Sequence, residues 1–248
     1  LDANHEVIGV TRRAGALAKY DGVREIVADV LDRETFLDAL DGVRADAVVH
    51  QLTSLAKPPA RFRDMRTTNR LRTEGTSTLI AAAREIGAKK LVAASFFGGY
   101  GFTDLGDDEL DELAPFGEVD GRADPVLRAL LSLEQQVHAF GGVTLRYGLF
   151  YDSTTTAVSP VSRTWDGVLP MLHVSDAASA AVLALTKGKP GSAYNVADPN
   201  PLSYRSREFA RAAAAGLRPP VQYSDGLLRA VAPFGALMMT RQSIRMST

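Results

Sequence analysis

The chain has 248 residues, of which 46% are hydrophobic and 23% charged, enough for one large domain or for a domain with a small lobe. A formal net charge of −1, with 28 basic residues spread among 29 acidic ones, argues against binding to nucleic acid or to an anionic membrane. The absence of cysteine excludes disulfides, thiol catalysis and cysteine-bound zinc. The sequence shows neither an apolar run of transmembrane length nor a secretory signal, so we expect a soluble, cytoplasmic protein.

Apolar runs of strand length alternate with helical patterns as far as Asp152. The runs are rich in β-branched residues and mostly continuous, which is typical of strands buried on both faces of a sheet. They span residues 6–11, 25–30, 47–52, 90–95 and 143–148. Helical patterns cover residues 33–40, 63–87, where Gly87 is a suitable C-terminal stop, and a segment that opens at Asp124. This alternation predicts an α/β fold, a Rossmann-type doubly wound parallel sheet.

The sequence changes in character after Tyr151, where it becomes polar and rich in Ser and Thr. A helix over 175–188 with Ser175 as its cap, a strand over 192–198 and an Ala-rich segment follow. We expect residues 1–152, with strand contributions from 165–198, to form a dinucleotide-binding domain, and residues 153–248 to form mostly a small C-terminal substrate lobe. The chain starts at Leu1 and ends in "RQSIRMST" without a closing element, so we expect segments of its parent to be absent from both ends.

The ends of the first two predicted strands carry the features expected of a nucleotide site. In a Rossmann unit a glycine loop follows the first strand, and the residue that reads the adenosine ribose ends the second strand. If residues 6–11 are that second strand, the first strand and its glycine loop fall upstream of Leu1. Arg12 and Arg13 follow the strand, and paired guanidinium groups suit a 2′-phosphate, which predicts NADP with NAD as the alternative. The competing interpretation is two solvated arginines at a strand end.

Asp29 ends the next predicted strand and is the second candidate at this edge. Its carboxylate could accept a hydrogen bond from the adenine amino group, or it could serve an ordinary turn. Asp32 is the better candidate for the cap of the following helix.

Taken in order, these elements resemble the extended short-chain dehydrogenase/reductases, the NAD(P)-dependent epimerase/dehydratase group. The matching stretches are "HEVIGVTRR", "VADVLD", "DAVVHQLT", "TNRLRTEGTSTLIAAAREIGAKKLVAAS", "VTLRYGLFYD", "MLHVSDAASAAVLAL" and "SAYNVAD". The resemblance implies a cofactor along the strand ends, with a homodimer as the usual assembly. It adds to Arg12, Arg13 and Asp29 a set of further cofactor contacts: Val30, Gln51, Leu52, Asn69 and Tyr147.

The sequence departs from this family at the catalytic helix. The family carries Tyr-x-x-x-Lys there, with the tyrosine as acid/base and the lysine lowering its pKa, and a spacing of four places both on one helical face. Alignment on Glu134 puts Val126 at the tyrosine position and Leu130 at the lysine position, and none of the 7 tyrosines has a lysine four residues later. The helix therefore resembles the family's catalytic helix without its acid/base pair.

Apolar residues replace the missing pair and predict a pocket for a hydrophobic or aromatic substrate. The predicted substrate contacts are Phe96, Val126, Leu130 and Phe150; the alternative is that they are ordinary core residues. Ser95 and Tyr100 are the candidates for replacement catalytic groups, as donors that polarise a substrate carbonyl; the alternative is that each serves packing or satisfies the backbone. The 4 histidines show no ligand spacing, so no metal site is indicated.

These features predict an atypical NADP-dependent oxidoreductase or epimerase-type enzyme that acts on a small, fairly apolar carbonyl or hydroxyl substrate. The partner is thus a small molecule, with no nucleic acid and no membrane. Two alternatives stay open. One is a non-catalytic NADP-binding sensor or regulator, and the other is a redox-neutral isomerase or dehydratase on the same scaffold.

Overall fold

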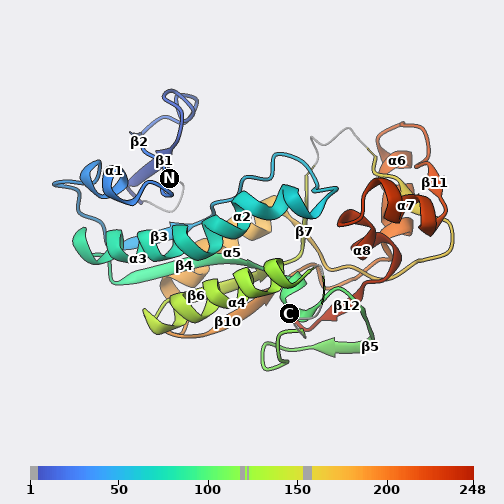
Figure 1. The fold of residues 1–248 in the computed structure, drawn as a ribbon. Helices are drawn as coiled ribbons and strands as arrows, with labels where there is room; N and C mark the ends of the chain where they lie inside the picture. Colours follow the sequence, from blue (N-terminus) through green and yellow to red (C-terminus); the bar gives the residue numbers. More distant parts are fainter. Residues whose placement is uncertain (1–4, 118–120, 122, 153–157) are drawn as a thin grey trace.

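The computed structural model describes residues 5–117, 121, 123–152 and 158–248 (Figure 1). Its centre is a four-stranded parallel sheet in the order β10-β6-β4-β3. The strands are β3 (Ala47–His50), β4 (Lys90–Phe96), β6 (Val143–Tyr147) and β10 (Ala193–Val196). A separate parallel pair joins β1 (Val7–Thr11) to β2 (Val23–Val27).

Helices cover both faces of the central sheet. Alternate side chains of β4 show this, because Leu91 and Ala93 pack in one cluster with Leu133 of α4 (Asp124–Ala139). Val92 instead packs in a cluster with Ala177 of α5 (Val174–Lys187). Continuous apolar strands are required when both faces are buried. The predicted α/β class with a Rossmann-type doubly wound parallel sheet is thus confirmed.

The long helix expected over 63–87 is built from four segments. They are the 3₁₀ turn η1 (Phe62–Met65), α2 (Arg66–Arg70), the π-helical turn η2 (Leu71–Gly75) and α3 (Thr76–Glu85). Within this stretch the Thr73 and Thr76 hydroxyls donate back to the carbonyls of Asn69 and Arg72, at 3.1 and 2.7 Å. Such side-chain bonds compete with the regular helical ladder. The expected stop at Gly87 is confirmed by its φ of 82°.

The C-terminal part of the chain lies at the opposite end of the molecule from β1 and β2 (Figure 1). It contains α6 (Tyr204–Ala214), α7 (Asp225–Val231) and α8 (Gly235–Thr240). Three short parallel pairs accompany these helices: β7 (Leu149–Tyr151) with β9 (Met171–His173), β8 (Val161–Ser162) with β11 (Gln222–Tyr223), and β5 (Asp104–Leu110) with β12 (Ser243–Met246). The 3₁₀ turn η3 (Phe97–Tyr100) follows β4, and α1 (Arg33–Asp38) follows β2.

Several predicted boundaries were wrong. The strand expected over 25–30 ends at Val27, so Asp29 lies in the turn that follows it. Helix α5 begins at Val174, and its cap is His173, whose Nδ1 accepts from the Ser175 N–H at 3.3 Å. The C-terminal segment was expected to lack a closing element, yet it forms β12. The cap at Asp32 is confirmed, because its carboxylate accepts from the Thr35 N–H.

In the described part of the chain, none of the helices combines the length and apolarity needed to span a bilayer.

Candidate functional site

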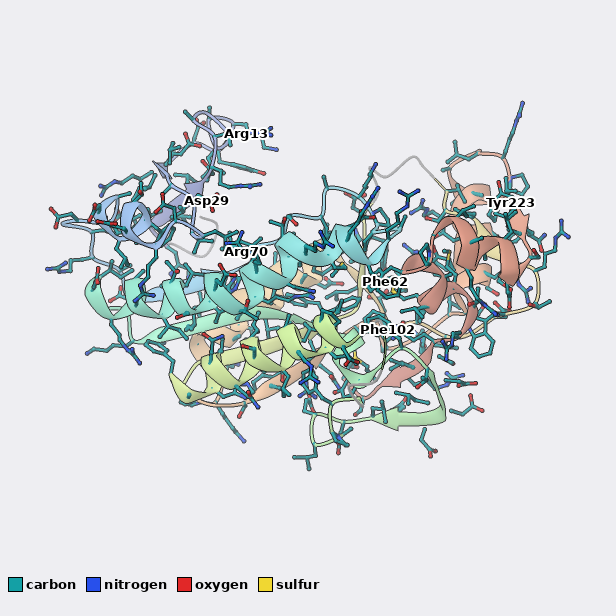
Figure 2. All side chains as sticks on the ribbon, viewed as in Figure 1. Arg13, Asp29, Phe62, Arg70, Phe102 and Tyr223 are labelled. Atoms are coloured by element: carbon teal, nitrogen blue, oxygen red, sulfur yellow. The ribbon has the colours of Figure 1, made fainter. Side chains whose placement is uncertain are left out.

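The N-terminal strand pair carries the predicted contacts to an adenosine phosphate. Figure 2 shows Arg13 and Asp29 close to this pair, just beyond the ends of its strands, and Arg70 on the helix beneath it. Arg12 and Arg13 are exposed, and neither guanidinium forms a hydrogen bond or ion pair with the described residues. Exposed, uncommitted guanidiniums at a strand's C-terminal end fit a phosphate ligand. This fit supports a cofactor at the edge of the sheet.

Asp29 serves a turn at this edge, since its Oδ1 accepts from the Leu31 N–H at 3.0 Å. Its charge also reaches Arg70. The hydrogen bond and charge of Glu74 raise the pKa of Arg70 most, burial opposes them, and Asp29 adds a smaller increase. A turn carboxylate with a second free oxygen can still accept from a ligand, so its predicted adenine contact stays a prediction.

The remaining predicted cofactor residues differ in how much of their polar surface is available. Val30 is buried in the core beside α1. Gln51 donates from Nε2 to the Tyr147 hydroxyl at 3.3 Å, and that hydroxyl donates to the Ala177 carbonyl at 3.2 Å. Burial raises the pKa of Tyr147. The phenol is therefore protonated at neutral pH and already bonded within the protein.

Leu52 and Asn69 complete the predicted set. The Leu52 N–H donates to Nδ1 of His50 at 3.2 Å, which fixes the chain just beyond β3. The Oδ1 of Asn69, on α2, is buried and has no hydrogen-bond partner among the described residues. An orphaned buried amide oxygen costs free energy unless a water or ligand donates to it. Among the predicted cofactor residues, the Oδ1 of Asn69 is thus a buried acceptor that a ligand or a water could satisfy.

Helix α4 places Val126 and Leu130 deep in the apolar interior. Asp124 and Pro125 start the helix. Proline is tolerated there because backbone N–H groups in the first turn have no partner within the helix. Val126 is 2% exposed and Leu130 is 0% exposed. Both belong to an apolar cluster with Met65, Phe102, Leu127 and Phe234, against which Leu55, Phe62, Phe96, Phe116, Ala123, Leu237 and Met238 also pack. The positions that the sequence assigned to an acid/base pair are therefore filled by packed hydrocarbon.

A buried polar network begins one turn further along the same face of α4, at Glu134. Glu134 accepts two hydrogen bonds from Arg146, Nε to Oε1 at 3.1 Å and Nη2 to Oε2 at 2.9 Å, and a third from the Ser95 hydroxyl at 2.6 Å. Burial lowers the pKa of Arg146, but the hydrogen bonds and charge of Glu134 outweigh it, and the net pKa is raised. The network ties β4, α4 and β6 together.

Tyr100 belongs to the same network. Its hydroxyl accepts from Nη1 of Arg146 at 2.9 Å and donates to Oδ1 of Asn195 at 2.7 Å, with the Asp111 carbonyl at 3.0 Å. Its ring is 3% exposed, and burial raises the pKa of the phenol. The structure thus gives both Ser95 and Tyr100 bonding partners inside the protein, while their predicted role as substrate donors stays a prediction.

The predicted substrate contacts are not all at one place. Phe96 is partly buried and its ring meets that of Phe97 at 4.3 Å between centroids. Phe150, on β7, is 52% exposed and packs at 5.3 Å against the ring of Tyr147. Val126 and Leu130 lie in the cluster against which Phe96 packs, whereas Phe150 lies beside Tyr147. Their contact with a substrate stays a prediction.

Sequence reasoning missed the Glu134–Arg146 pair and the aromatic residues from three separate parts of the chain that meet in the cluster beside α4. One signal for the pair was present: Arg146 is the charged residue of the strand VTLRY, and a buried guanidinium requires a partner. No comparable signal marked Phe62, Phe102 and Phe234. They are distant in sequence and meet only in the folded chain, with ring centroids 5.5 Å (Phe62–Phe234) and 5.6 Å (Phe102–Phe234) apart.

A doubly wound parallel sheet with helices on both faces defines a Rossmann-type fold. The model of the NAD dependent epimerase/dehydratase family matches residues 1–124, and the chain belongs to this family. A 3-diazoavenalumate denitrifying reductase from Streptomyces sp is 37% identical over an alignment of 240 positions, and the match covers 87% of this chain and 75% of the relative.

Solved structures confirm the fold. The UDP-glucose 4-epimerase of Thermotoga maritima, with UDP-glucose, gives a TM-score of 0.78 at 18% identity and covers 100% of this chain and 84% of its own. The UDP-glucose 4-epimerase of Thermus thermophilus, in complex with NAD, gives 0.76 at 22% identity, with coverages of 99% and 84%. At this level of identity the likeness concerns the fold.

Proposed function

We propose that this protein is an NAD(P)-dependent reductase that transfers hydride to a small, largely apolar substrate without an acid/base group at the usual helix positions. The observation that carries this proposal is the burial of Val126 and Leu130, at 2% and 0% exposure, within packed hydrocarbon. Neither side chain can donate or accept a proton. The chemistry must then suit a substrate that needs little proton transfer from this helix.

The residues at the strand ends fit a dinucleotide. Arg12 and Arg13 would hold the adenosine phosphate, which favours NADP over NAD, and Asn69 would meet a donor of the cofactor or of an ordered water. When bound, the cofactor would supply hydride. The protein's own part is to orient the substrate against the apolar cluster and to exclude water from it.

The name of the 37% identical relative describes a reductase that removes nitrogen from a diazo compound. This supports a diazonium compound as the hydride acceptor. In a diazonium substrate, the carbon forms its new bond with hydride while N₂ departs with the C–N bonding pair. Atoms and charge balance without a proton from the protein. A site that has lost its tyrosine and lysine would retain full competence for such a step, whereas carbonyl reduction would be slowed by the absence of a proton donor.

The test uses the full-length protein with NADPH and NADH. Titration establishes whether either binds, and stopped-flow absorbance then follows NADPH oxidation by an aryl diazonium salt and by an aryl ketone of similar size. We expect turnover of the diazonium compound at a rate nearly independent of pH between about pH 6 and 9, because no protein group has to ionise. An enzymatic rate must exceed that of the same mixture without protein.

The competing hypothesis is that Ser95 or Tyr100 donates to a substrate carbonyl. It predicts ready turnover of the ketone and a large loss of turnover in Tyr100→Phe. That result would refute the proposal, and cofactor binding without any turnover would favour the sensor alternative.

A further inference from the structure

A partly enclosed cavity of about 380 Å³ lies where α7 and α8 approach the N-terminal end of α4. Phe62, Phe102, Leu127 and Leu237 form its apolar wall, and Arg229 and Arg241 are also on its lining. The same four apolar side chains belong to, or pack against, the cluster that contains Val126 and Leu130. The cavity is therefore continuous with the hydrocarbon that replaces the acid/base pair.

The wall of this cavity is aromatic as well as apolar. Figure 2 shows Phe62 and Phe102 between the central helices and the C-terminal helices. Phe234 lies edge-on to both, with interplanar angles of 79° to Phe62 and 64° to Phe102. Rings at such spacings and angles favour further aromatic contacts, because ring edges and faces carry opposite partial charge. A flat, unsaturated ligand suits this wall better than a saturated polar one.

The charged groups on the lining are both cationic. Arg229 forms a long contact with Asp225, Nη2 to Oδ2 at 3.6 Å, and remains 58% exposed at its side chain. Arg241 forms no hydrogen bond or ion pair with the part of the chain that the structure describes. Asp225 is itself bonded to the Ser162 hydroxyl at 2.5 Å. One uncommitted guanidinium and one weakly paired guanidinium thus border an aromatic cavity.

We propose that this cavity binds a small aromatic or conjugated carboxylic acid, with its flat body against Phe62 and Phe102 and its carboxylate on Arg229 and Arg241. Guanidinium groups are the preferred partners of carboxylates because their N–H donors match the two oxygens. The volume is at the low end for small-molecule sites. A nucleotide sugar would leave many of its sugar hydroxyls without partners on the aromatic wall formed by Phe62 and Phe102.

This inference rests on the proposed function, since it takes the bound acid to be the molecule that receives hydride. It deepens that function by assigning recognition of the acid's charge to the two arginines of the cavity lining. The reacting end of the acid would then lie against the apolar cluster.

The experiment measures binding by calorimetry, with the full-length protein and without cofactor, so that redox activity is not needed. The probes are cinnamate and its neutral amide, which share size and aromatic body. The variants are Arg241→Gln and Arg229→Gln. The matched control is Arg128→Gln, because Arg128 lies on α4 with a side chain 70% exposed and does not line the cavity. Thermal melting verifies that each variant is folded.

We expect wild-type protein to bind cinnamate about tenfold more tightly than the amide, as one charge-assisted bond would give. Arg241→Gln should remove that preference, Arg229→Gln should reduce it, and Arg128→Gln should preserve it. Equal affinity for acid and amide, no binding of either, or an equal loss in the control would overturn the inference. If instead only the proposed function fails, cinnamate binding and its dependence on Arg241 persist while no substrate oxidises NADPH.

Discussion

The buried ion pair between Glu134 and Arg146 gives the sharpest prediction for stability. The two side chains are 4% and 7% exposed, and the pair is bidentate. In Glu134→Gln the shape is kept, but the guanidinium loses its counter-charge while remaining buried. Its contacts to the Tyr100 hydroxyl and the Glu112 carbonyl, at 2.9 and 3.3 Å, supply no negative charge.

Removing one partner of a buried pair typically costs about 3–5 kcal/mol, since the remaining charge has left water without compensation. For a chain of this size that loss corresponds to a fall in melting temperature of roughly 6–20 °C. Urea unfolding followed by circular dichroism measures the change in free energy of unfolding.

The double variant Glu134→Gln with Arg146→Met separates the pair from its surroundings. Replacing both charges removes the unpaired guanidinium, so the double variant should be more stable than Glu134→Gln alone. The exposed pair Arg70–Glu74, at 2.7 Å, is the control, and Glu74→Gln should leave the urea midpoint within error of wild type. If Glu134→Gln behaved like Glu74→Gln, the buried network would not hold β4, α4 and β6 together as we argue.

Three further predictions concern the cofactor, the pH dependence of stability and Asn69. Replacing both Arg12 and Arg13 by Ala should weaken the binding of NADPH roughly tenfold or more and leave the binding of NADH unchanged. A fluorescence titration measures both affinities, and an equal loss for NADPH and NADH would show that the 2′-phosphate binds elsewhere. Burial, and then the charge of Arg72, lower the pKa of His50 to about 4, so the unfolded chain takes up a proton near pH 6.5 while the folded one does not. Stability is therefore lost as pH falls from about 6.5 to about 4, by up to about 3 kcal/mol, and His50→Gln should flatten that slope in urea unfolding at several pH values. Asn69→Leu should remove an orphaned amide, so it should leave the apoprotein no less stable while lowering NADPH affinity; unchanged affinity would show that no ligand donor reaches this position.

Local sequence patterns were sufficient for the fold class and for most of the central elements. Continuous β-branched runs predicted the strands that now form β3, β4 and β6, because burial on both faces leaves no polar alternation. Asp32 and Gly87 marked helix ends through chemistry confined to a few residues. Patterns failed at the π turn Leu71–Gly75, and at the short strands of the C-terminal part, which pair with partners far along the chain.

The sequence by itself determined that α4 carries no Tyr-x-x-x-Lys motif, since residue identity at a given helical spacing needs no coordinates. Only the tertiary structure decided what surrounds those positions. The packing of the sheet against the helices brings Glu134 to Arg146. It also places Arg241 beside the wall formed by Phe62 and Phe102. Such contacts join side chains from different elements, and they form only where folding buries the two surfaces together, which no local pattern encodes.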